Sequence, residues 1–230
     1  MVAKVQPSQP VSGSPEIPSD PHKFYRLGVE LKRATAINYA LRLGMAAFPL
    51  IDKQPASGAA WSSWTANPGV YDKSDAHWSA ASGYALSPTR DSLMAIVDLD
   101  DPVFLPELLA AAPHLAHTFQ VKRGDHIHFY IKLARPMNSA IVSRKQKGHE
   151  VASVRAYGAY VVGPHSDHAS GQSYIPNNNQ IQKLSGYEQD QLLALFVETR
   201  IPMSVTKQSA LPIPCVAKPG INSDPSVERQ

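Results

Sequence analysis

The chain has 230 residues, of which 43% are hydrophobic and 18% charged, a composition typical of one globular domain rather than of a disordered or membrane-spanning chain. The formal net charge of +3 permits a nucleic-acid partner but excludes no class of function by itself. The single cysteine, Cys215, excludes disulfides and cysteine-based zinc sites within the chain, and there is neither an apolar leader nor a membrane span, so we expect a cytoplasmic protein without a membrane partner.

The two ends of the chain differ in composition from the middle. Residues 1–22 and 201–230 are rich in Pro, Ser and Gln and lack helical or strand periodicity, which predicts a disordered N-terminal tail and a flexible C-terminal tail. Residues 23–200 are expected to form the single domain.

Between these ends, the hydrophobic pattern predicts alternating helices and strands. Apolar residues at helical spacing over 36–43 end at Gly44, and the apolar run 45–51 reads as a strand. A weakly helical stretch then ends near Trp78. The further predicted elements are a strand at 84–87, a buried strand at 93–100, a helix at 102–112, a hairpin at 118–133, a strand at 154–162 and an amphipathic helix at 184–197. This order predicts an α+β fold in which helices cover one side of a mainly antiparallel sheet.

The buried strand ends in three acids, of which two share a face. Alternate side chains of a strand point the same way, so Asp98 and Asp100 are expected to lie about 7 Å apart with Val97 and Leu99 buried opposite. Two carboxylates in this position repel each other, and a divalent cation would relieve the repulsion; removal of either acid should then leave the fold stable. A simpler alternative is that Asp100 or Asp101 only caps the helix that follows, which leaves Asp98 without a role.

Two later segments carry polar groups suited to phosphate. The hairpin strand places His126, His128 and Tyr130 on one face, and exposed histidines there can bind a phosphate, bind a metal or do neither. After the strand at 154–162, a Gly-Pro turn leads into a polar loop that can present Ser166 and His168, with Arg155 before it, to a triphosphate.

Taken in order, these segments resemble the bifunctional primase-polymerase (prim-pol) domain of the archaeo-eukaryotic primase superfamily. The family's acid-apolar-acid strand, small-x-His strand and Pro-x-Ser-x-His loop correspond here to Asp98-Leu99-Asp100, Gly124-Asp125-His126 and Pro164-His165-Ser166-Asp167-His168. Its "Gly-x-x-x-x-Pro" strand and "Lys-x-Pro" loop correspond to Gly44 to Pro49 and Lys53-Gln54-Pro55. The likeness covers about residues 33–185 and implies an RRM-like sheet with a prim-pol catalytic core.

The resemblance implies a metal-dependent DNA primase/polymerase that joins nucleoside triphosphates on a DNA template in replication. It assigns Asp98 and Asp100 to Mg²⁺ or Mn²⁺ and His126 to catalysis and to the phosphates of the incoming nucleotide. The further nucleotide-binding residues that it implies are Arg155, Ser166, His168 and Lys53. The sequence has no Walker A motif, so a separate replicative helicase is the expected partner, and the family suggests a phage or plasmid origin.

One position departs from the family pattern and keeps two alternatives open. The family places a third metal-binding acid where this chain has Ser153, so either Glu150 or a water replaces it, or the chain is a weak or inactive prim-pol-like DNA-binding module. A second alternative is a rolling-circle replication endonuclease, which His126-Ile127-His128 also resembles and in which Tyr187 would be the nucleophile.

Overall fold

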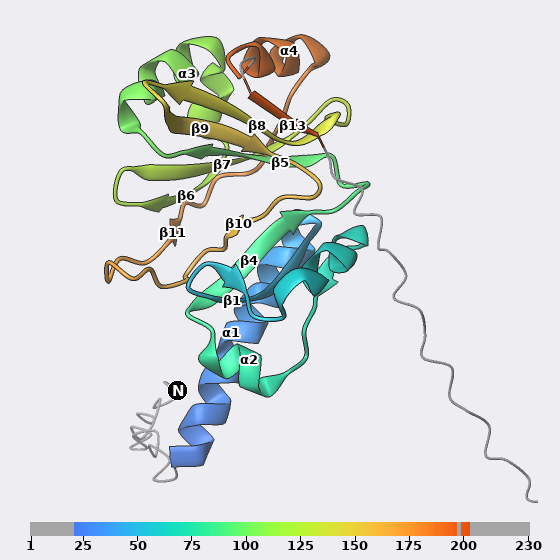
Figure 1. Ribbon diagram of the computed structural model, residues 1–230, viewed down its shortest axis with the longest axis vertical. Coiled ribbons are helices and arrows are strands. Elements are labelled where there is room, and N and C mark those ends of the chain that lie inside the picture. Colours follow the sequence, from blue (N-terminus) through green and yellow to red (C-terminus); the bar gives the residue numbers. More distant parts are fainter. Residues whose placement is uncertain (1–20, 197–198, 203–230) are drawn as a thin grey trace, which may run out of the picture.

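The computed structural model describes residues 21–196 and 199–202, so the predicted tails lie almost entirely outside the described residues, as does Cys215. Two β-sheets share a core, and helices pack around them (Figure 1). Neither described range contains a helix long and apolar enough to cross a membrane.

The smaller sheet, sheet A, comes from the first part of the chain and one later strand. Its strands are β1 (Met45–Ile51), β2 (Gln54–Pro55), β3 (Gly69–Val70), β4 (Gly83–Pro88) and β10 (Val161–Val162). They run in the order β10-β4-β1-β2, and β3 pairs in parallel with β1. The helices α1 (Pro21–Leu43) and α2 (Asp75–Ala80) pack on one face, and the 3₁₀ helix η1 (Gly58–Ala66) places two tryptophans against the other.

The larger sheet, sheet B, carries Asp98 on its central strand, and Asp100 follows just beyond the end of that strand. Its strands are β5 (Met94–Leu99), β6 (Phe119–Arg123), β7 (His126–Lys132), β8 (Ser139–Gln146), β9 (His149–Arg155), β11 (Ile175–Pro176), β12 (Gln182–Lys183) and β13 (Thr199–Pro202). The order is β11-β6-β7-β5-β9-β8-β13, with β12 beside β7. Its outer face is covered by η2 (Pro102–Phe104), α3 (Leu105–Ala111), η3 (Pro113–His117) and α4 (Gly186–Ala194).

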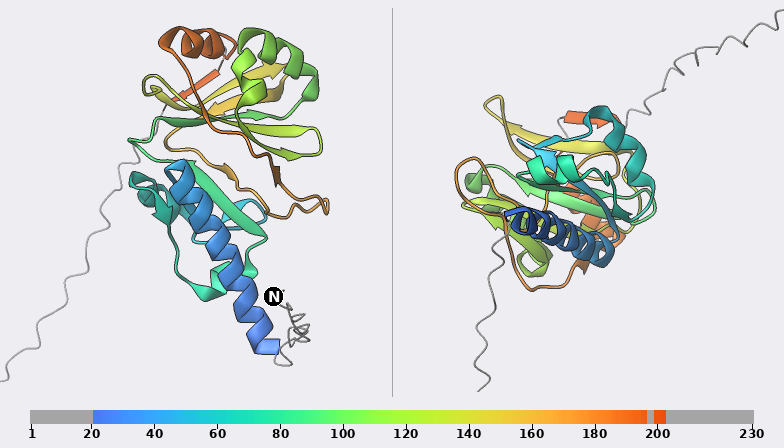
Figure 2. Two further views of the ribbon diagram at one scale, coloured as in Figure 1. Left: turned by 180° about the vertical axis from the view of Figure 1, so that it is seen from behind. Right: turned by 90° about the horizontal axis from the view of Figure 1, so that it is seen from below.

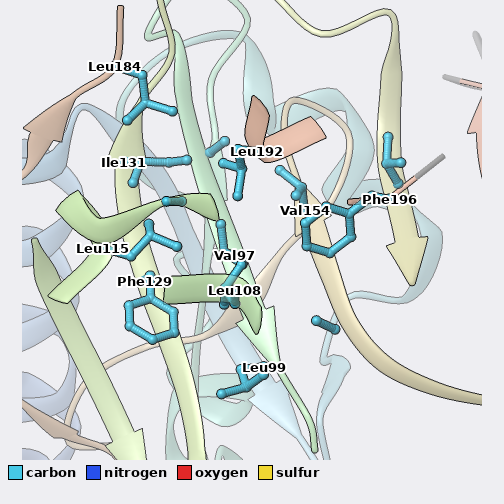
Figure 3. Close-up of a cluster of buried hydrophobic side chains, with 14 of the residues drawn as sticks. Val97, Leu99, Leu108, Leu115, Phe129, Ile131, Val154, Leu184, Leu192 and Phe196 are labelled. Carbon is cyan, nitrogen blue, oxygen red and sulfur yellow. The ribbon is translucent and has the colours of Figure 1, made fainter. Parts of the chain in front are cut away.

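The alternation of side chains along β5 divides the residues of sheet B between two cores. Val97 and Leu99 belong to the outer core, where they pack with Leu108 of α3 and Leu192 of α4 (Figure 3). Ile96 points the other way, into the inner core that sheet B shares with sheet A and α1. Because Asp98 follows the same alternation, it lies on the inner face.

The α+β class is confirmed, and most predicted elements are found within a few residues of their predicted bounds. The single strand predicted at 154–162 is wrong. The chain turns at residues 156–160, where Gly158 has a φ of 89°, so β9 belongs to sheet B and β10 to sheet A. Strand β8 was not predicted. The sequence therefore indicated one sheet where the structure has two.

Candidate active site

Strand pairing places three polar side chains in one row across the inner face of sheet B. Asp98 of β5 lies opposite His128 of β7 on one side and Ser153 of β9 on the other. All three are buried, with exposed fractions of 8%, 6% and 0%. Polar groups in this position need partners, because an unpaired buried charge is costly.

Asp98 finds those partners in one histidine and one arginine. One carboxylate oxygen lies 3.4 Å from Nε2 of His128, and the other lies 3.0 Å from Nε of Arg155. The same guanidinium donates to Oγ of Ser153 at 3.2 Å and to the carbonyl oxygen of Tyr160 at 3.3 Å. Arg155 is therefore the cation that compensates Asp98 in the structure.

Glu150 approaches the same guanidinium from the start of β9. Its carboxylate lies 3.8 Å from Nη2 of Arg155 and accepts a hydrogen bond from Ser143 at 2.6 Å. It also contributes to the raised pKa of Asp100, which places its charge within electrostatic reach of that acid. Glu150 is thus a neighbour of both aspartates, held by Arg155 and Ser143.

Asp100 lies just beyond the end of β5 and is more open than Asp98. Its side chain is 40% exposed, and its carboxylate is 3.6 Å from Nδ1 of His126. Burial, followed by the negative charge of Asp98, raises the pKa of Asp100, while Arg155 and His126 oppose that rise. The predicted pair thus meets at one end of β5, with His126 beside it.

The next carboxylate along the chain has a different role. Oδ1 of Asp101 accepts a hydrogen bond from the backbone N–H of Val103 at 2.9 Å and so caps η2. The capping alternative is correct for Asp101 and leaves Asp98 and Asp100 free for the site.

His128 belongs to the same row, although the sequence pattern did not single it out as a site residue. Burial lowers its pKa despite the attraction of Asp98, and the lowered pKa favours the neutral ring. Its Nδ1 has no hydrogen-bond partner among the described residues. The alternation of His126 and His128 signalled a shared face, but only the strand register identifies which of the two lies opposite Asp98.

A cleft of about 480 Å³ lies between sheet A and the loop that follows β10. Lys53, His168 and Tyr174 line it. Asp52 and Lys53 form the two-residue turn between β1 and β2, and both have positive φ, an unfavourable conformation for residues other than glycine. Strain of this kind is often found where a turn positions a functional side chain.

His168 is oriented within this loop by its neighbour Ser170. Its Nδ1 accepts the backbone N–H of Ser170 at 3.1 Å, so in the neutral ring the proton is on Nε2, which can donate. Partial burial, then the positive charges of Arg123 and Lys53, lower the pKa of His168. A neutral donor and a lysine thus lie along one cleft.

Tyr174 connects the cleft to the acid row. Its ring centroid lies 5.5 Å from that of His128 and 6.3 Å from that of His168. The guanidinium of Arg123 lies over the same ring at 5.6 Å. The predicted site residues therefore form two neighbouring groups, with Tyr174 between them. Lys53 and His168 line the cleft, whereas Asp98, Asp100, His126 and Arg155 lie at the acid row.

Ser166 is nearby but already engaged. Its hydroxyl accepts the backbone N–H of Tyr84 at 3.1 Å, and the residue is 2% exposed. This contact joins the loop to β4 of sheet A. Phosphate binding by Ser166 stays a prediction.

The geometry does not favour the endonuclease alternative. Tyr187 lies on α4, which packs on the outer face of sheet B through Leu192, whereas His128 lies on the inner face. The sheet therefore separates this exposed tyrosine from the histidine with which it would have to act.

Asp98 and Asp100 supply two carboxylates, which suits a divalent cation whose coordination shell is completed by the substrate. Within residues 21–196 and 199–202, no group of three or more His, Cys, Asp or Glu side chains could hold a metal ion by itself. Mg²⁺ in phosphoryl-transfer sites is commonly bound through one or two carboxylates together with phosphates and water. Burial and then the negative charge of Asp98 raise the pKa of Asp100, and such a cation would relieve the repulsion between the two carboxylates, so the donor set fits.

A family model for the N-terminal domain of bifunctional DNA primase/polymerases matches residues 36–188. The chain belongs to this family. The matched range contains every predicted site residue from Lys53 to His168, so the prim-pol resemblance is confirmed. A comparison with curated proteins found no match.

Proposed function

We propose that this prim-pol chain is a metal-dependent nucleotidyltransferase that extends or starts a strand on a DNA template. The observation that carries the proposal is the pair Asp98 and Asp100 at the end of β5, beside a cleft bordered by Lys53 and His168. Sheet B would then be the RRM-like catalytic core implied by the family. When bound, Mg²⁺ or Mn²⁺ would position the triphosphate and lower the pKa of the attacking 3′ hydroxyl.

The residues of the chain would divide the remaining work. Asp98 and Asp100 would hold the cation, and His126, beside Asp100, would contact the incoming phosphates. Lys53 and His168 would donate to the triphosphate from the cleft that they line. Arg155 can serve the same phosphates only by moving away from Asp98, with which it pairs at 3.0 Å.

That ion pair also favours a second candidate function. With Ser153 in place of the family's third acid, the cation next to Asp98 is a guanidinium supplied by the chain itself. A chain that retains this arrangement would bind DNA and nucleotide without joining nucleotides. The two candidates share a fold and differ in the chemistry that follows binding.

A matched pair of variants tests the proposal. Labelled-nucleotide incorporation on single-stranded template, with and without a primer and in Mg²⁺ or Mn²⁺, should fall at least about a hundredfold in Asp100→Asn. Asp101→Asn removes the adjacent carboxylate, which only caps η2, and should retain incorporation within about threefold of wild type.

Template binding, measured by fluorescence anisotropy, separates the two candidates. Wild-type binding without incorporation in either metal would favour the binding module. Equal loss of incorporation in Asp100→Asn and Asp101→Asn would contradict the assignment of the metal site. A replicative helicase as partner, a cytoplasmic location and a phage or plasmid origin stay predictions.

A further inference from the structure

Helix α1 carries apolar side chains on two opposite faces. One face is buried against the two sheets through Val29, Ala36, Tyr39, Ala40 and Leu43. On the other face, Leu27, Leu31, Ile37 and Leu41 are 57%, 67%, 45% and 64% exposed. A surface helix normally presents polar residues to solvent, and Figure 2 shows α1 on the outside of the molecule. A continuous apolar stripe of this kind usually marks an interaction site.

The spacing of the stripe is symmetric about its centre. With the small residue Ala34, its apolar positions are 27, 31, 34, 37 and 41, so the intervals are four, three, three and four residues. The pattern reads the same from either end, and its smallest side chain is in the middle. An interface with two-fold symmetry requires a surface that is complementary to itself. We propose that the stripe is a homodimer interface, in which α1 of a second copy packs antiparallel with the two-fold axis near Ala34.

The polar residues that border the stripe fit the same arrangement. Glu30 and Asn38 are each four residues from Ala34, on opposite sides, so antiparallel pairing brings Glu30 level with Asn38 of the partner subunit. An amide can donate to a carboxylate there, whereas a wholly apolar partner would leave both groups without a partner. The same pairing brings Arg26 level with Arg42 of the partner subunit, which places two like charges together. Glu30 lies one helical turn from that level, and its negative charge offsets the repulsion.

The size of the stripe sets the expected affinity of the dimer. The fifteen residues from Leu27 to Leu41 span about 21 Å of helix, and one helix pair of this length buries less than the roughly 800 Å² per partner of a standard interface. The dimer should therefore depend on concentration, with a dissociation constant of about 1–100 μM. This inference does not depend on the proposed catalytic function.

Sedimentation equilibrium of the full chain from about 1 to 300 μM tests the proposal. Wild type should shift from monomer to dimer, and Leu31→Glu should raise the dissociation constant at least about thirtyfold. Val103→Glu is the matched control, because Val103 is 77% exposed on η2, outside the stripe, and should leave dimerisation unchanged. Circular dichroism melts check that both variants are folded.

A cross-link locates the axis. In a Cys215→Ala background, Ala34→Cys should form a disulfide-linked dimer under mild oxidation, and Val103→Cys should not. A wild-type chain that is monomeric throughout, as it would be if another part of the chain covers the stripe, overturns the proposal. So does a dimer that survives Leu31→Glu, because it would use another surface.

Discussion

Asp98 and Asp100 are two residues apart, yet their surroundings give the two carboxylates different effects on stability. Asp98 is buried against Arg155, so its removal would leave a partly buried guanidinium with less compensation. Asp100 is more exposed, and its pKa is raised by burial and by repulsion from Asp98. The expectation that removing either acid leaves the fold stable therefore applies to Asp100 alone.

Ser153 stands where the resemblance to the family implies a third acid, and it lies beside Asp98, one of the two acids that we propose hold the metal. It is fully buried and directly opposite Asp98. Ser153→Asp would add a third carboxylate, so the Mn²⁺ concentration for half-maximal incorporation should fall about tenfold. Without metal, the added buried charge should lower the free energy of unfolding by about 1–3 kcal/mol, and Mn²⁺ should restore it.

Ser153→Asn is the control for this prediction, because it has nearly the shape of aspartate and no charge. Incorporation against Mn²⁺ concentration and thermal melts with and without Mn²⁺ should separate the two variants. If both depend on Mn²⁺ as wild type does, the side chain at position 153 does not reach the cation.

At the residue scale, the sequence predicted the features that follow from the alternation of side chains along one strand. Asp98 and Asp100 follow from the two-residue period of β5. The pairing of Asp98 with His128 and Arg155 could not be predicted, because it depends on the register of three strands that are distant in the sequence. The same long-range dependence hid the role of Tyr174, which no local pattern connects to His128.

At the scale of elements, a close backbone contact fixes the loop after β10 against sheet A. A Cβ at Gly83 would lie 2.3 Å from Cβ of Ser166 and 2.4 Å from its Oγ. Only glycine allows this approach, which lets the Ser166 hydroxyl accept the N–H of Tyr84. The loop that carries His168 is thus positioned by β4.

Gly83→Ala should therefore destabilise the protein by about 1–3 kcal/mol, which corresponds to a fall in Tm of several degrees for a chain of this size. Gly28→Ala is the matched control. A Cβ at Gly28 meets nothing within 4 Å in α1, so alanine there should stabilise by about 0.5–1 kcal/mol. Thermal melts of both variants measure the difference, and a neutral Gly83→Ala would mean that the loop moves easily away from β4.

Two elements were predicted poorly, the segment 154–162 and strand β8. Residues 154–162 alternate well enough to suggest one strand, but the turn at Gly158 sends the two halves to different sheets. Strand β8 contains Ser139, Ser143, Arg144 and Lys145, so its apolar signal was weak. Both errors arise because strand membership is decided by distant partners rather than by local propensity.

At the scale of the whole molecule, the candidate site depends on both sheets. Sheet B provides the acids, while sheet A provides Lys53 and, through β4, the position of His168. The α+β class followed from the order of elements, but the division into two sheets required contacts that only the folded chain reveals. A nucleotide bound across this region should hold the two sheets together and stabilise the entire fold.

Lys53 is the residue with which to test that coupling. A deoxynucleoside triphosphate with Mn²⁺, at about a hundred times its dissociation constant, should stabilise wild type by about 2.7 kcal/mol. Lys53→Met keeps the length of the side chain and removes its charge, so nucleotide affinity should fall about tenfold and the stabilisation by about 1.4 kcal/mol.

Lys147→Met, in the turn between β8 and β9, controls for loss of a cation elsewhere. In thermal shift assays the nucleotide-dependent rise in Tm should shrink in Lys53→Met and stay at the wild-type value in Lys147→Met. Equal rises in all three proteins would place the triphosphate outside this cleft while leaving the acid pair to be judged by incorporation.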